Sequence, residues 1–357
     1  MKYSDGLDEH MTEEGDGASV AERDTVLAVV RDGDESAFAQ VVRRHERELR
    51  VHCYRMVASF DDAEDLTQKT FLRAWTKRDT FQGRSTFRAW LYRIATNACL
   101  DFLDRHPTRR LAAPGPGPAS PVTIPWLSPF PDHLLPAAPE EEEPAARAVA
   151  KETIELAFLA AIQHLPPRQR AVVILRDVLG WPASHTAELL GDSVASANSA
   201  LQRARGTLRE HLPTRRTEWA ATTEPSQAER ALLRRYVAAS EQADLAALTS
   251  LLRSDARFGQ RPGASGHTEG ETLRYDGRDA IIAAWTPACD GPDAMEFRVF
   301  ETFVNRQPAA AVYVRAKGES VYQAFGLDVL RTEGDQVTEV LAFTADVFPM
   351  LGLPATW

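Results

Sequence analysis

Residues 61–105 read DDAEDLTQKTFLRAWTKRDTFQGRSTFRAWLYRIATNACLDFLDR. The stretch opens on acidic residues, and carboxylates at a helix start cap free N–H groups and oppose the helix dipole. Leu66, Thr70 and Ala74 then recur every four residues, which predicts a helix, and Gly83 interrupts the pattern. A second apolar stripe follows on Phe87, Trp90, Leu91, Ile94, Ala98 and Phe102. The stretch therefore predicts two helices joined by a short loop.

This stretch closely resembles the second region of bacterial sigma factors of the extracytoplasmic-function (ECF) group. In that family a helix like DAEDLTQKTFLRAW docks on the clamp helices of the RNA polymerase β′ subunit, and the loop and helix after it melt and read the −10 promoter element. The resemblance implies polymerase contacts by Asp62, Asp65, Leu66, Gln68, Phe71 and Trp75. It implies −10 contacts by Phe81, Arg84, Phe87, Arg88, Asn97 and Asp101.

The bulk charge of the chain hides a strong local asymmetry. The 357 residues favour two or three domains, and their net charge of −10 alone argues against a nucleic-acid partner. However, residues 69–110 hold ten basic and three acidic side chains, whereas residues 1–24 hold two basic and eight acidic ones. Phosphate contact depends on local charge, so residues 69–110 suit DNA. Residues 1–20 are acidic and poor in large apolar groups, and we expect them to be disordered.

The cysteines and the hydropathy of the chain indicate a cytoplasmic protein. Cys53, Cys99 and Cys289 are widely separated and have no metal-site spacing, so we expect reduced thiols and no metal. The sequence has no apolar run of membrane-spanning length and no basic–apolar leader. We expect no cofactor.

Residues 106–144 hold 11 of the chain's 22 prolines. Proline removes a backbone donor and disfavours helix at the preceding residue, so we expect a linker here. Residues 124–132, IPWLSPFPD, are unusually aromatic for a spacer. One interpretation is a tether packed on a neighbouring domain. The other, implied by the resemblance, is that sigma linkers run through the polymerase toward its active centre, and the sequence leaves both open.

Helical patterning resumes near Ala145, and residues 168–212 predict three helices, RQRAVVILRDVLG, ASHTAELLG and SVASANSALQRARGTLREHL. A tight turn at Gly191–Asp192, with Asp192 or Ser193 as the cap, makes the last two a helix-turn-helix. The buried stripe of the last helix is expected at Val194, Ala197, Leu201, Ala204, Leu208 and Leu212. Its opposite side offers groups that bind base edges and phosphates. They are Ser196, Asn198, Ser199, Gln202, Arg203 and Arg205.

Residues 165–208 resemble the fourth region of the same sigma family, which binds the −35 promoter element and the β flap of the polymerase. The resemblance implies −35 contacts by Ser196, Asn198, Ser199, Gln202 and Arg203. His185 stands where many relatives carry an acidic residue, and we assign it no role. Residues 163–216 carry eight basic and four acidic side chains, which suits DNA binding.

The chain continues well past residue 213. A helix is expected through residues 232–251 and another near 278–285, and alternating apolar residues predict strands near 295–299, 310–314, 324–330 and 337–343. Helices followed by a curved antiparallel sheet predict an α+β cone. LLRRYVAASEQADLAALTSLLRSDARF, YDGRDAIIAAW and NRQPAAAVYV resemble the SnoaL-like branch of the ketosteroid-isomerase-like superfamily. From about residue 25 to 357 the chain is similar to actinobacterial ECF sigma factors with a fused SnoaL-like domain.

Members of that superfamily are isomerases, cyclases or non-catalytic modules. A catalyst needs a carboxylate or histidine of shifted pKa inside the cone, near an oxyanion donor. The pocket candidates are Asp255, Tyr313 and Tyr322, whereas His267 and Asp276 are interpreted as loop and turn residues. These residues form no active-site spacing and a fold does not confer chemistry, so we expect no enzymatic activity.

The expected architecture is multidomain, with two all-α sigma domains followed by an α+β SnoaL-like cone. The expected parts are a disordered N-terminus at 1–20, region 2 at 21–106, the linker at 107–144, region 4 at 145–213 and the SnoaL-like domain at 225–357. The expected function is a sigma factor that binds core RNA polymerase, recognises the −10 and −35 elements and initiates transcription. The SnoaL-like domain is expected to regulate it, and a small ligand in the cone and an anti-sigma factor are partners left open.

Two other functions compete with this interpretation. The first is a SnoaL-type enzyme with a helical appendage, which co-purification of core polymerase would argue against. The second is a helix-turn-helix repressor, which would not need a polymerase-docking helix at 61–79.

Overall fold

The computed structural model describes residues 20–83, 85–112, 119–136, 154–212, 225–260 and 272–357. The chain divides into two compact units. The helical unit comprises Met1–Pro118 and Ala161–Leu212, and the sheet unit comprises Ala119–Ala160 and Pro213–Trp357. Each unit has its own buried core. Part of the expected linker therefore belongs to the sheet unit rather than standing between compact parts.

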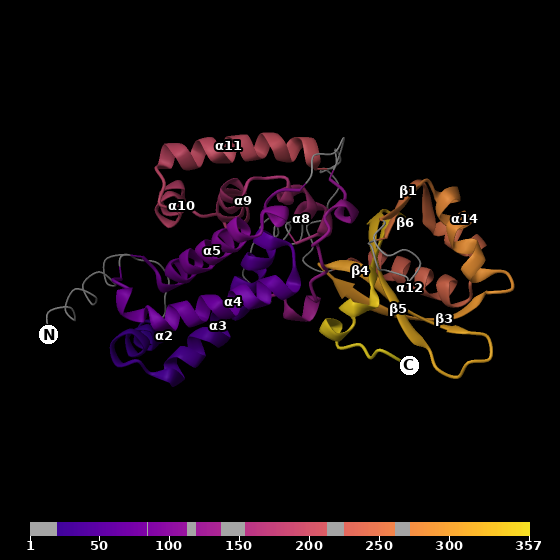
Figure 1. Ribbon diagram of the computed structural model, residues 1–357, viewed down its shortest axis with the longest axis horizontal. Coiled ribbons are helices and arrows are strands. Elements are labelled where there is room, and N and C mark those ends of the chain that lie inside the picture. Colours follow the sequence, from indigo (N-terminus) through magenta and orange to yellow (C-terminus); the bar gives the residue numbers. More distant parts are fainter. Residues whose placement is uncertain (1–19, 84, 113–118, 137–153, 213–224, 261–271) are drawn as a thin grey trace. The chain divides into compact units, whose positions relative to one another are not determined.

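The first part of the helical unit is a bundle of long helices (Figure 1). The Ser59 hydroxyl accepts the N–H of Asp62 at 3.4 Å, which caps the helix that the acidic residues predicted. Leu66, Thr70 and Ala74 are buried along it, as their spacing indicated. The elements are α2 (Val20–Leu27), η1 (Ala28–Asp32), α3 (Glu35–Val57), α4 (Phe60–Thr76), η2 (Arg78–Thr80), α5 (Phe87–Arg105) and α6 (Pro107–Arg110).

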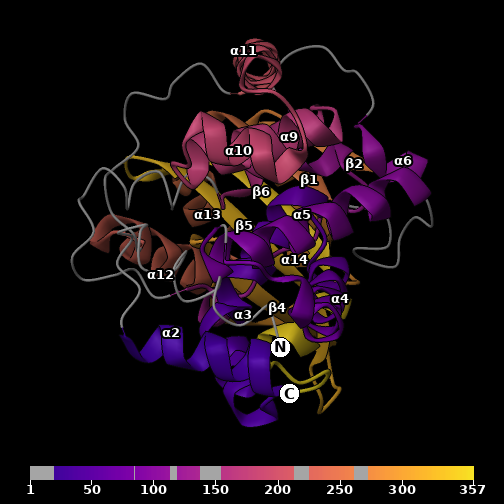
Figure 2. The ribbon, with the colours of Figure 1, turned by 90° about the vertical axis from the view of Figure 1, so that its left-hand side faces the viewer.

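The second part of the helical unit contains the expected helix-turn-helix. Gly191, at φ 65°, ends one helix, and Ser193 caps the next through the N–H of Ser196 at 3.1 Å. Figure 2 views the last helix, α11, along its axis above α9 and α10. Val194 was expected in the buried stripe but is 44% exposed, because it lies in the first turn and the stripe begins at Ala197. The elements are the last residues of α8 (Leu156–Gln163), from Ala161 on, and then α9 (Pro167–Val173), η5 (Ile174–Val178), α10 (Ala183–Leu190) and α11 (Val194–His211).

The sheet unit is an α+β fold with one six-stranded sheet in the order β2-β1-β6-β5-β4-β3. The prediction of an all-antiparallel sheet was wrong at one place, because β1 pairs parallel to β6. The single helix expected through 232–251 is two helices, since Ala243 takes φ 50° between them. The elements are α12 (Gln227–Glu241), α13 (Leu245–Leu251), β1 (Leu252–Gln260), β2 (Leu273–Asp276), α14 (Arg278–Cys289), β3 (Met295–Val304), β4 (Gln307–Ala316), β5 (Gln323–Glu333) and β6 (Gln336–Thr344).

The core of the sheet unit lies between its helices and one face of the sheet, here called the helix-covered face (Figure 1). Side chains of α12, α13 and α14 pack there against alternate residues of the strands. The fully buried members include Leu233, Leu252, Ala256, Ile281, Ala310, Leu330, Val337 and Val340. The short turns η3 (Pro121–Thr123) and η4 (Asp132–Leu134), from the expected linker, also belong to this unit, and η6 (Ala345–Val347) and η7 (Pro349–Leu351) follow the last strand.

Candidate polymerase and nucleic-acid interfaces

The predicted polymerase-docking residues divide into a buried and an exposed set on α4. Leu66 and Phe71 are buried and hold the helix in the bundle. Asp65 and Gln68 are exposed, and Asp62 is partly exposed and paired with Arg109. Trp75 is half-buried, with its ring 5.0 Å from that of Phe38.

Leu72 is the residue of α4 that the sequence did not single out. Its side chain is 66% exposed, the largest exposed fraction among the large apolar residues of the described chain. It lies one turn after Gln68 and two turns after Asp65, so the three share an exposed face. The signal was present in the sequence, because Leu72 falls outside the four-residue stripe that buries Leu66, Thr70 and Ala74.

The predicted −10 residues on the loop after α4 are aromatic and buried. The rings of Phe81 and Phe87 lie 5.1 Å apart, and that of Phe81 lies 5.5 Å from Trp90. Both phenylalanines are less than a tenth exposed, so in this state they shape the loop from inside. Arg84 falls outside the described residues. Whether the phenylalanines touch promoter DNA stays a prediction.

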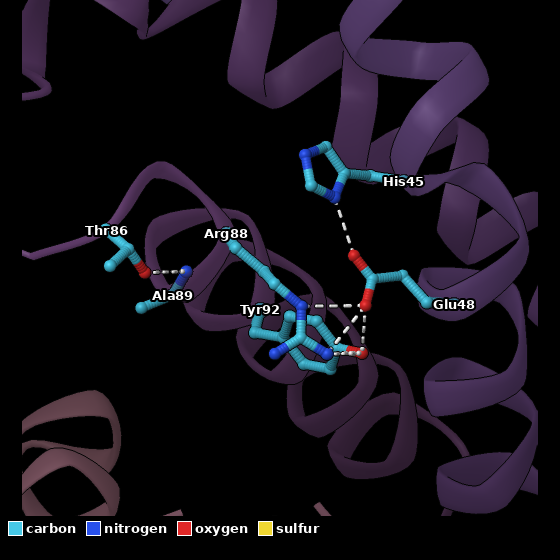
Figure 3. A network of polar contacts seen from close by, with 6 residues as sticks. All are labelled: His45, Glu48, Thr86, Arg88, Ala89 and Tyr92. Atoms are coloured by element: carbon cyan, nitrogen blue, oxygen red, sulfur yellow. Dashed lines mark hydrogen bonds and ion pairs between the residues drawn. The ribbon is translucent and has the colours of Figure 1, made fainter. Parts of the chain in front are cut away.

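Arg88, another predicted −10 residue, is held by Glu48, which is partly buried (Figure 3). Its Nε donates to Glu48 Oε2 at 2.8 Å, and Tyr92 Oη donates to the same oxygen at 3.1 Å. His45 Nδ1 lies 2.6 Å from the other oxygen of Glu48. Burial alone raises the pKa of Glu48, but the hydrogen bonds from His45 and Arg88 outweigh it and lower the pKa to about 2. Glu48 thus fixes the start of α5 to α3.

His52 is a second buried polar group between these two helices. Its Nε2 lies 2.9 Å from the Thr96 hydroxyl, and its ring lies 4.9 Å from that of Tyr92. Burial lowers the pKa of His52 to about 3, with a further lowering from the charge of Arg55. The imidazole is therefore neutral in the folded protein at neutral pH.

The remaining predicted −10 residues lie along the exposed side of α5. Asn97 is exposed, and so is Arg93 one turn before it. Asp101 is exposed as well and accepts a hydrogen bond from Arg73 at 3.2 Å. The structure thus places Asn97 and Asp101 together on one face, apart from the buried Phe81–Phe87 pair.

The predicted −35 residues form one exposed face of α11. Ser196, Asn198, Ser199, Gln202 and Arg203 are all exposed, opposite the buried Ala197, Leu201, Ala204 and Leu208. The 3.6-residue repeat of a helix explains why sequence alone could assign this face.

A groove of about 360 Å³ runs beside this face. It adds two arginines that the sequence reading missed, Arg176 from η5 and Arg209 from the end of α11. Arg205 forms a two-bonded ion pair with Asp177, at 3.0 Å and 2.6 Å. Three guanidinium groups beside Asn198 and Gln202 suit a site where backbone phosphates and base edges are bound together. The lining residues are Arg176, Asn198, Leu201, Gln202, Arg205 and Arg209.

Arg170 is the largest fully buried side chain of the helical unit. It donates to the carbonyl oxygens of Ile162 at 3.0 Å and Arg110 at 3.1 Å, and also to that of Met56. Burial lowers its pKa to about 9. Arg170 thus joins the helix-turn-helix part of this unit to the bundle through carbonyl groups far apart in the sequence, which no local pattern could have indicated.

The three predicted pocket residues of the sheet unit do not meet. Asp255 has a 68% exposed side chain paired with Arg253. Tyr313 is buried and donates to the carbonyl of Pro354 at 2.9 Å, and Tyr322 lies under the guanidinium of Arg315. His267 lies outside the described residues. Within the described ranges there is also no cluster of three metal-binding side chains and no helix long and apolar enough to span a bilayer.

The linker residues of the sheet unit are held by the turn between β3 and β4. Asn305 exchanges two hydrogen bonds with the backbone of Phe130, at 2.9 Å and 2.7 Å, and its Nδ2 donates to the carbonyl of Ile154 at 2.7 Å. The N–H of Arg306 donates to Asp132 Oδ1 at 2.8 Å. We call this arrangement the linker clasp. Asn305 is fully buried in it, and Ile124, Leu127 and Phe130 of the linker are also buried.

Comparison with known proteins gives matches along almost the whole chain. Residues 41–108 match the Sigma-70 region 2 family, residues 155–208 match Sigma-70, region 4, and residues 233–340 match the SnoaL-like domain. ECF RNA polymerase sigma factor SigG of Mycobacterium tuberculosis (strain CDC 1551 / Oshkosh) is 38% identical over 333 residues, covering 91% of this chain and 85% of that protein.

Two further relatives mark the parts of this similarity. ECF RNA polymerase sigma factor SigW of Bacillus subtilis (strain 168) is 30% identical over 184 residues, covering 51% of this chain and 92% of its own. The crystal structure of Mycobacterium tuberculosis extracytoplasmic function sigma factor SigJ covers 89% of this chain and 99% of its own, with a TM-score of 0.54 and 21% identity. The SigJ match shows that the fold is shared.

Proposed function

The chain belongs to the extracytoplasmic-function sigma factors of bacterial RNA polymerase, and we propose how its residues divide that work. Like other members it binds core RNA polymerase and promoter DNA and is a transcription initiation factor rather than an enzyme. We infer that it works in the cytoplasm, where bacterial transcription takes place. The domain limits expected from the sequence are kept in this proposal, except that residues 119–136 act with the sheet unit.

The polymerase contact is assigned to the exposed face of α4. Asp65 and Gln68 supply polar contacts, and Leu72 supplies the apolar anchor that such interfaces need at their centre. Leu66, Phe71 and Trp75, which the resemblance also implied, support this face from the bundle side.

The promoter contacts are assigned to two exposed faces. Asn97 and Asp101 on α5, with the Phe81–Phe87 loop and Arg88, contact the −10 element. Ser196, Asn198, Ser199, Gln202 and Arg203 on α11 contact the −35 element, and Arg176 and Arg209 in the groove contact its phosphates. Run-off transcription with purified core polymerase, with and without the chain, tests the assignment, and discrete new starts with shared upstream hexamers are expected.

The sheet unit is assigned a regulatory role through the linker clasp. The single observation that carries this role is the set of hydrogen bonds from Asn305 and Arg306 to linker residues 130 and 132 and to Ile154, which follows the linker. Sigma linkers run through the polymerase, so a linker held on the sheet is unavailable to it. The clasp therefore inhibits engagement until the linker is released.

The substitution Asn305→Gly tests this role. Asn305 takes φ 54°, which glycine adopts without strain, so the turn is retained while the side-chain hydrogen bonds are lost. We expect more promoter-specific transcript at equal protein concentration. Asp335→Gly, a change to glycine at an exposed side chain in the β5–β6 turn, is the control and should leave transcription unchanged.

The outcomes separate the alternatives. Less transcript from the Asn305→Gly protein would mean that the clasped linker is the active form and would overturn the inhibitory role. Unchanged transcript, together with unchanged output after deletion of residues 214–357, would remove the regulatory role altogether.

A further inference from the structure

An ion pair fixes the orientation of one arginine on α11. Arg205 donates from Nε to Asp177 Oδ2 at 3.0 Å and from Nη2 to Asp177 Oδ1 at 2.6 Å. Asp177 lies in η5, so the pair joins two elements through residues that are 28 apart in the sequence. Two parallel bonds of this kind fix the plane of a guanidinium group as well as its distance. The side chain of Arg205 is nevertheless 56% exposed, so it is both oriented and accessible.

The backbone around Asp177 forms a π turn that is fixed by its neighbours. The N–H of Leu179 donates to the carbonyl of Ile174, five residues earlier, at 2.9 Å, and Ile174 is fully buried. In the same turn, Arg176 Nη1 donates to the carbonyl of Trp181 at 2.6 Å. Single π turns inside helical segments occur frequently at functional sites. Asp177 therefore stands on a segment held by core packing and hydrogen bonds rather than on a free loop.

The ion pair occupies only one edge of the guanidinium group of Arg205. Arginine has five N–H donors in a planar fork. The bonds to Asp177 use the Nε–H and one Nη2–H, which leaves the edge formed by Nη1 and the second Nη2–H. That edge presents two parallel donors, and guanine is the base that presents two acceptors, O6 and N7, in the major groove. The geometry of the remaining edge is therefore selective for guanine.

Arg205 lies on the same side of α11 as two of the predicted −35 residues. Asn198, Gln202 and Arg205 are separated by four and three residues, so they form one row along the helix. All three are exposed, and all three line the groove of about 360 Å³ beside α11. Arg205 is thus one turn from Gln202 and adjoins the face that is assigned to base edges.

The charge of Asp177 decides between the two kinds of DNA contact that are open to Arg205. A phosphate contact gains affinity through counterion release, which depends on net positive charge. The carboxylate of Asp177 cancels the charge of Arg205 and would itself be repelled by a phosphate, but it leaves the free donor edge in place. Arg205 is therefore suited to a base edge. Arg209 is suited to a phosphate, because its Nε donates to the carbonyl of Arg205 at 3.2 Å and not to a carboxylate.

We propose that Arg205 reads a guanine of the −35 element through its Nη1–Nη2 edge, and that Asp177 is the positioning residue that holds this edge toward the base. The inference rests on the proposed function, because it names one base that the groove beside α11 recognises. Arg176 and Arg209 keep their assignment to phosphates. The Asp177–Arg205 pair thus adds base specificity and little affinity for DNA in general.

Base substitution in the −35 element of one promoter tests the inference. The promoter is one that the run-off experiment identifies, and each base pair of its −35 element is replaced in turn. Fluorescence anisotropy measures how tightly holoenzyme with the full chain binds each DNA. For the wild-type chain we expect one G·C pair whose replacement weakens binding by about tenfold. Holoenzyme with the Arg205→Gln chain should bind the original and the replaced promoter equally tightly.

Two further substitutions separate the shape of the guanidinium group from its charge. Arg205→Lys keeps the charge but lacks the planar fork, so discrimination at that G·C pair should still fall by about tenfold. Asp177→Asn removes the carboxylate charge and frees Arg205 to contact a phosphate. It should therefore lower the discrimination and steepen the slope of log affinity against log salt by about 0.9. Glu210→Gln, at an exposed acidic residue of α11, is the matched control and should change neither quantity.

Three contrary results decide against the proposal. A preference for every G·C pair that survives in the Arg205→Gln chain would overturn the role of Arg205. If Asp177→Asn weakened binding to all −35 sequences by one factor at an unchanged salt slope, the pair would only hold α11 to η5. A wild-type holoenzyme with no base preference anywhere in the element would overturn the −35 assignment of α11 as well, so the two failures are distinguishable.

Folding of each variant is checked separately from DNA binding. Every variant chain should keep the helix content of the wild type by circular dichroism and bind core polymerase as tightly, because α4 makes that contact. If Asp177→Asn does not meet these conditions, the Arg205→Lys chain still decides the question. An unchanged discrimination in Arg205→Lys would show that the charge of Arg205, and not its fork of donors, is what the DNA requires.

Discussion

At the scale of single residues, a substitution of Leu72 should weaken binding to core polymerase without changing the stability of the fold. Its side chain is 66% exposed, so Leu72→Ala should change the free energy of unfolding by no more than about 0.5 kcal/mol. Loss of an apolar anchor at an interface should weaken core polymerase binding by about tenfold. Biolayer interferometry with immobilised core enzyme measures this. Leu111→Ala, at a residue that is 47% exposed elsewhere in the unit, is the control, and equal effects of both substitutions would contradict the assignment.

His52 makes a prediction about acid stability. The pKa of His52 is about 3 when folded and 6.5 in its ordinary range, so the unfolded chain binds the proton first. Its contribution is present above pH 6.5 and is lost as the pH falls toward 3. From this residue the helical unit should be about 2 kcal/mol less stable at pH 5 than at pH 7.

Urea unfolding at the two pH values measures the effect. His52→Gln should flatten the dependence, because the glutamine does not titrate. His185→Gln, at an exposed position, is the control. A wild-type protein with equal stability at pH 5 and pH 7 would show that His52 is protonated in the folded state.

Residue periodicity explains which site residues could be predicted. The exposed face of α11 follows from the helical repeat, so Asn198, Gln202 and their neighbours were assigned correctly as exposed. The roles of Arg170, Asn305 and Asp328 were not predicted, because each depends on a hydrogen-bond partner many residues away in the sequence. A hydrogen bond between residues 92 apart in the sequence, such as that of Tyr236 and Asp328, leaves no local pattern.

At the scale of elements, the exposed face of α11 should set the base specificity of promoter binding, and Arg176 and Arg209 of the groove should set its affinity. Gln202→Ala should reduce discrimination at one base pair of the −35 element by about 1–3 kcal/mol. Arg209→Ala should weaken holoenzyme binding to all promoters and lower the slope of log affinity against log salt by about 0.9. Fluorescence anisotropy at several salt concentrations measures both, and Glu210→Ala, exposed on the same helix, is the control. A change of base preference in Arg209→Ala would contradict the division.

The elements also show where sequence patterns fail. The helices α4, α5 and α11 of the helical unit were predicted in type and order, because their apolar stripes are long. β1 was not predicted as a full strand, since LRSDARFGQ follows a helix directly and carries charged residues between apolar ones. Its parallel pairing with β6, across four intervening strands in the sequence, is a property of the assembled sheet.

At the scale of the whole molecule, the linker clasp makes a prediction about truncation. Ile124, Leu127 and Phe130 are fully buried within the sheet unit. A chain of residues 1–213 retains these side chains but loses the sheet that covers them. We expect the truncated chain to bind the dye 8-anilinonaphthalene-1-sulfonate more strongly than the full chain and to aggregate at lower concentration.

A truncated chain with serine at all three positions is the control and should bind the dye no more than the full chain. Transcription assays of truncated chains should therefore include this variant. Otherwise a fall in transcript caused by aggregation could be mistaken for the loss of an activating sheet unit. Equal dye binding by the truncated and full chains would show that the linker buries these residues without the sheet unit.

Asn305 has a further consequence, for evolution. By bonding to both Phe130 and Ile154, one side chain holds two segments that are far apart in the sequence. Loss of this side chain would release both segments together, so selection on the clasp should act on the asparagine itself. An alignment of orthologues should therefore show a constant asparagine and constant spacing between residues 124 and 132.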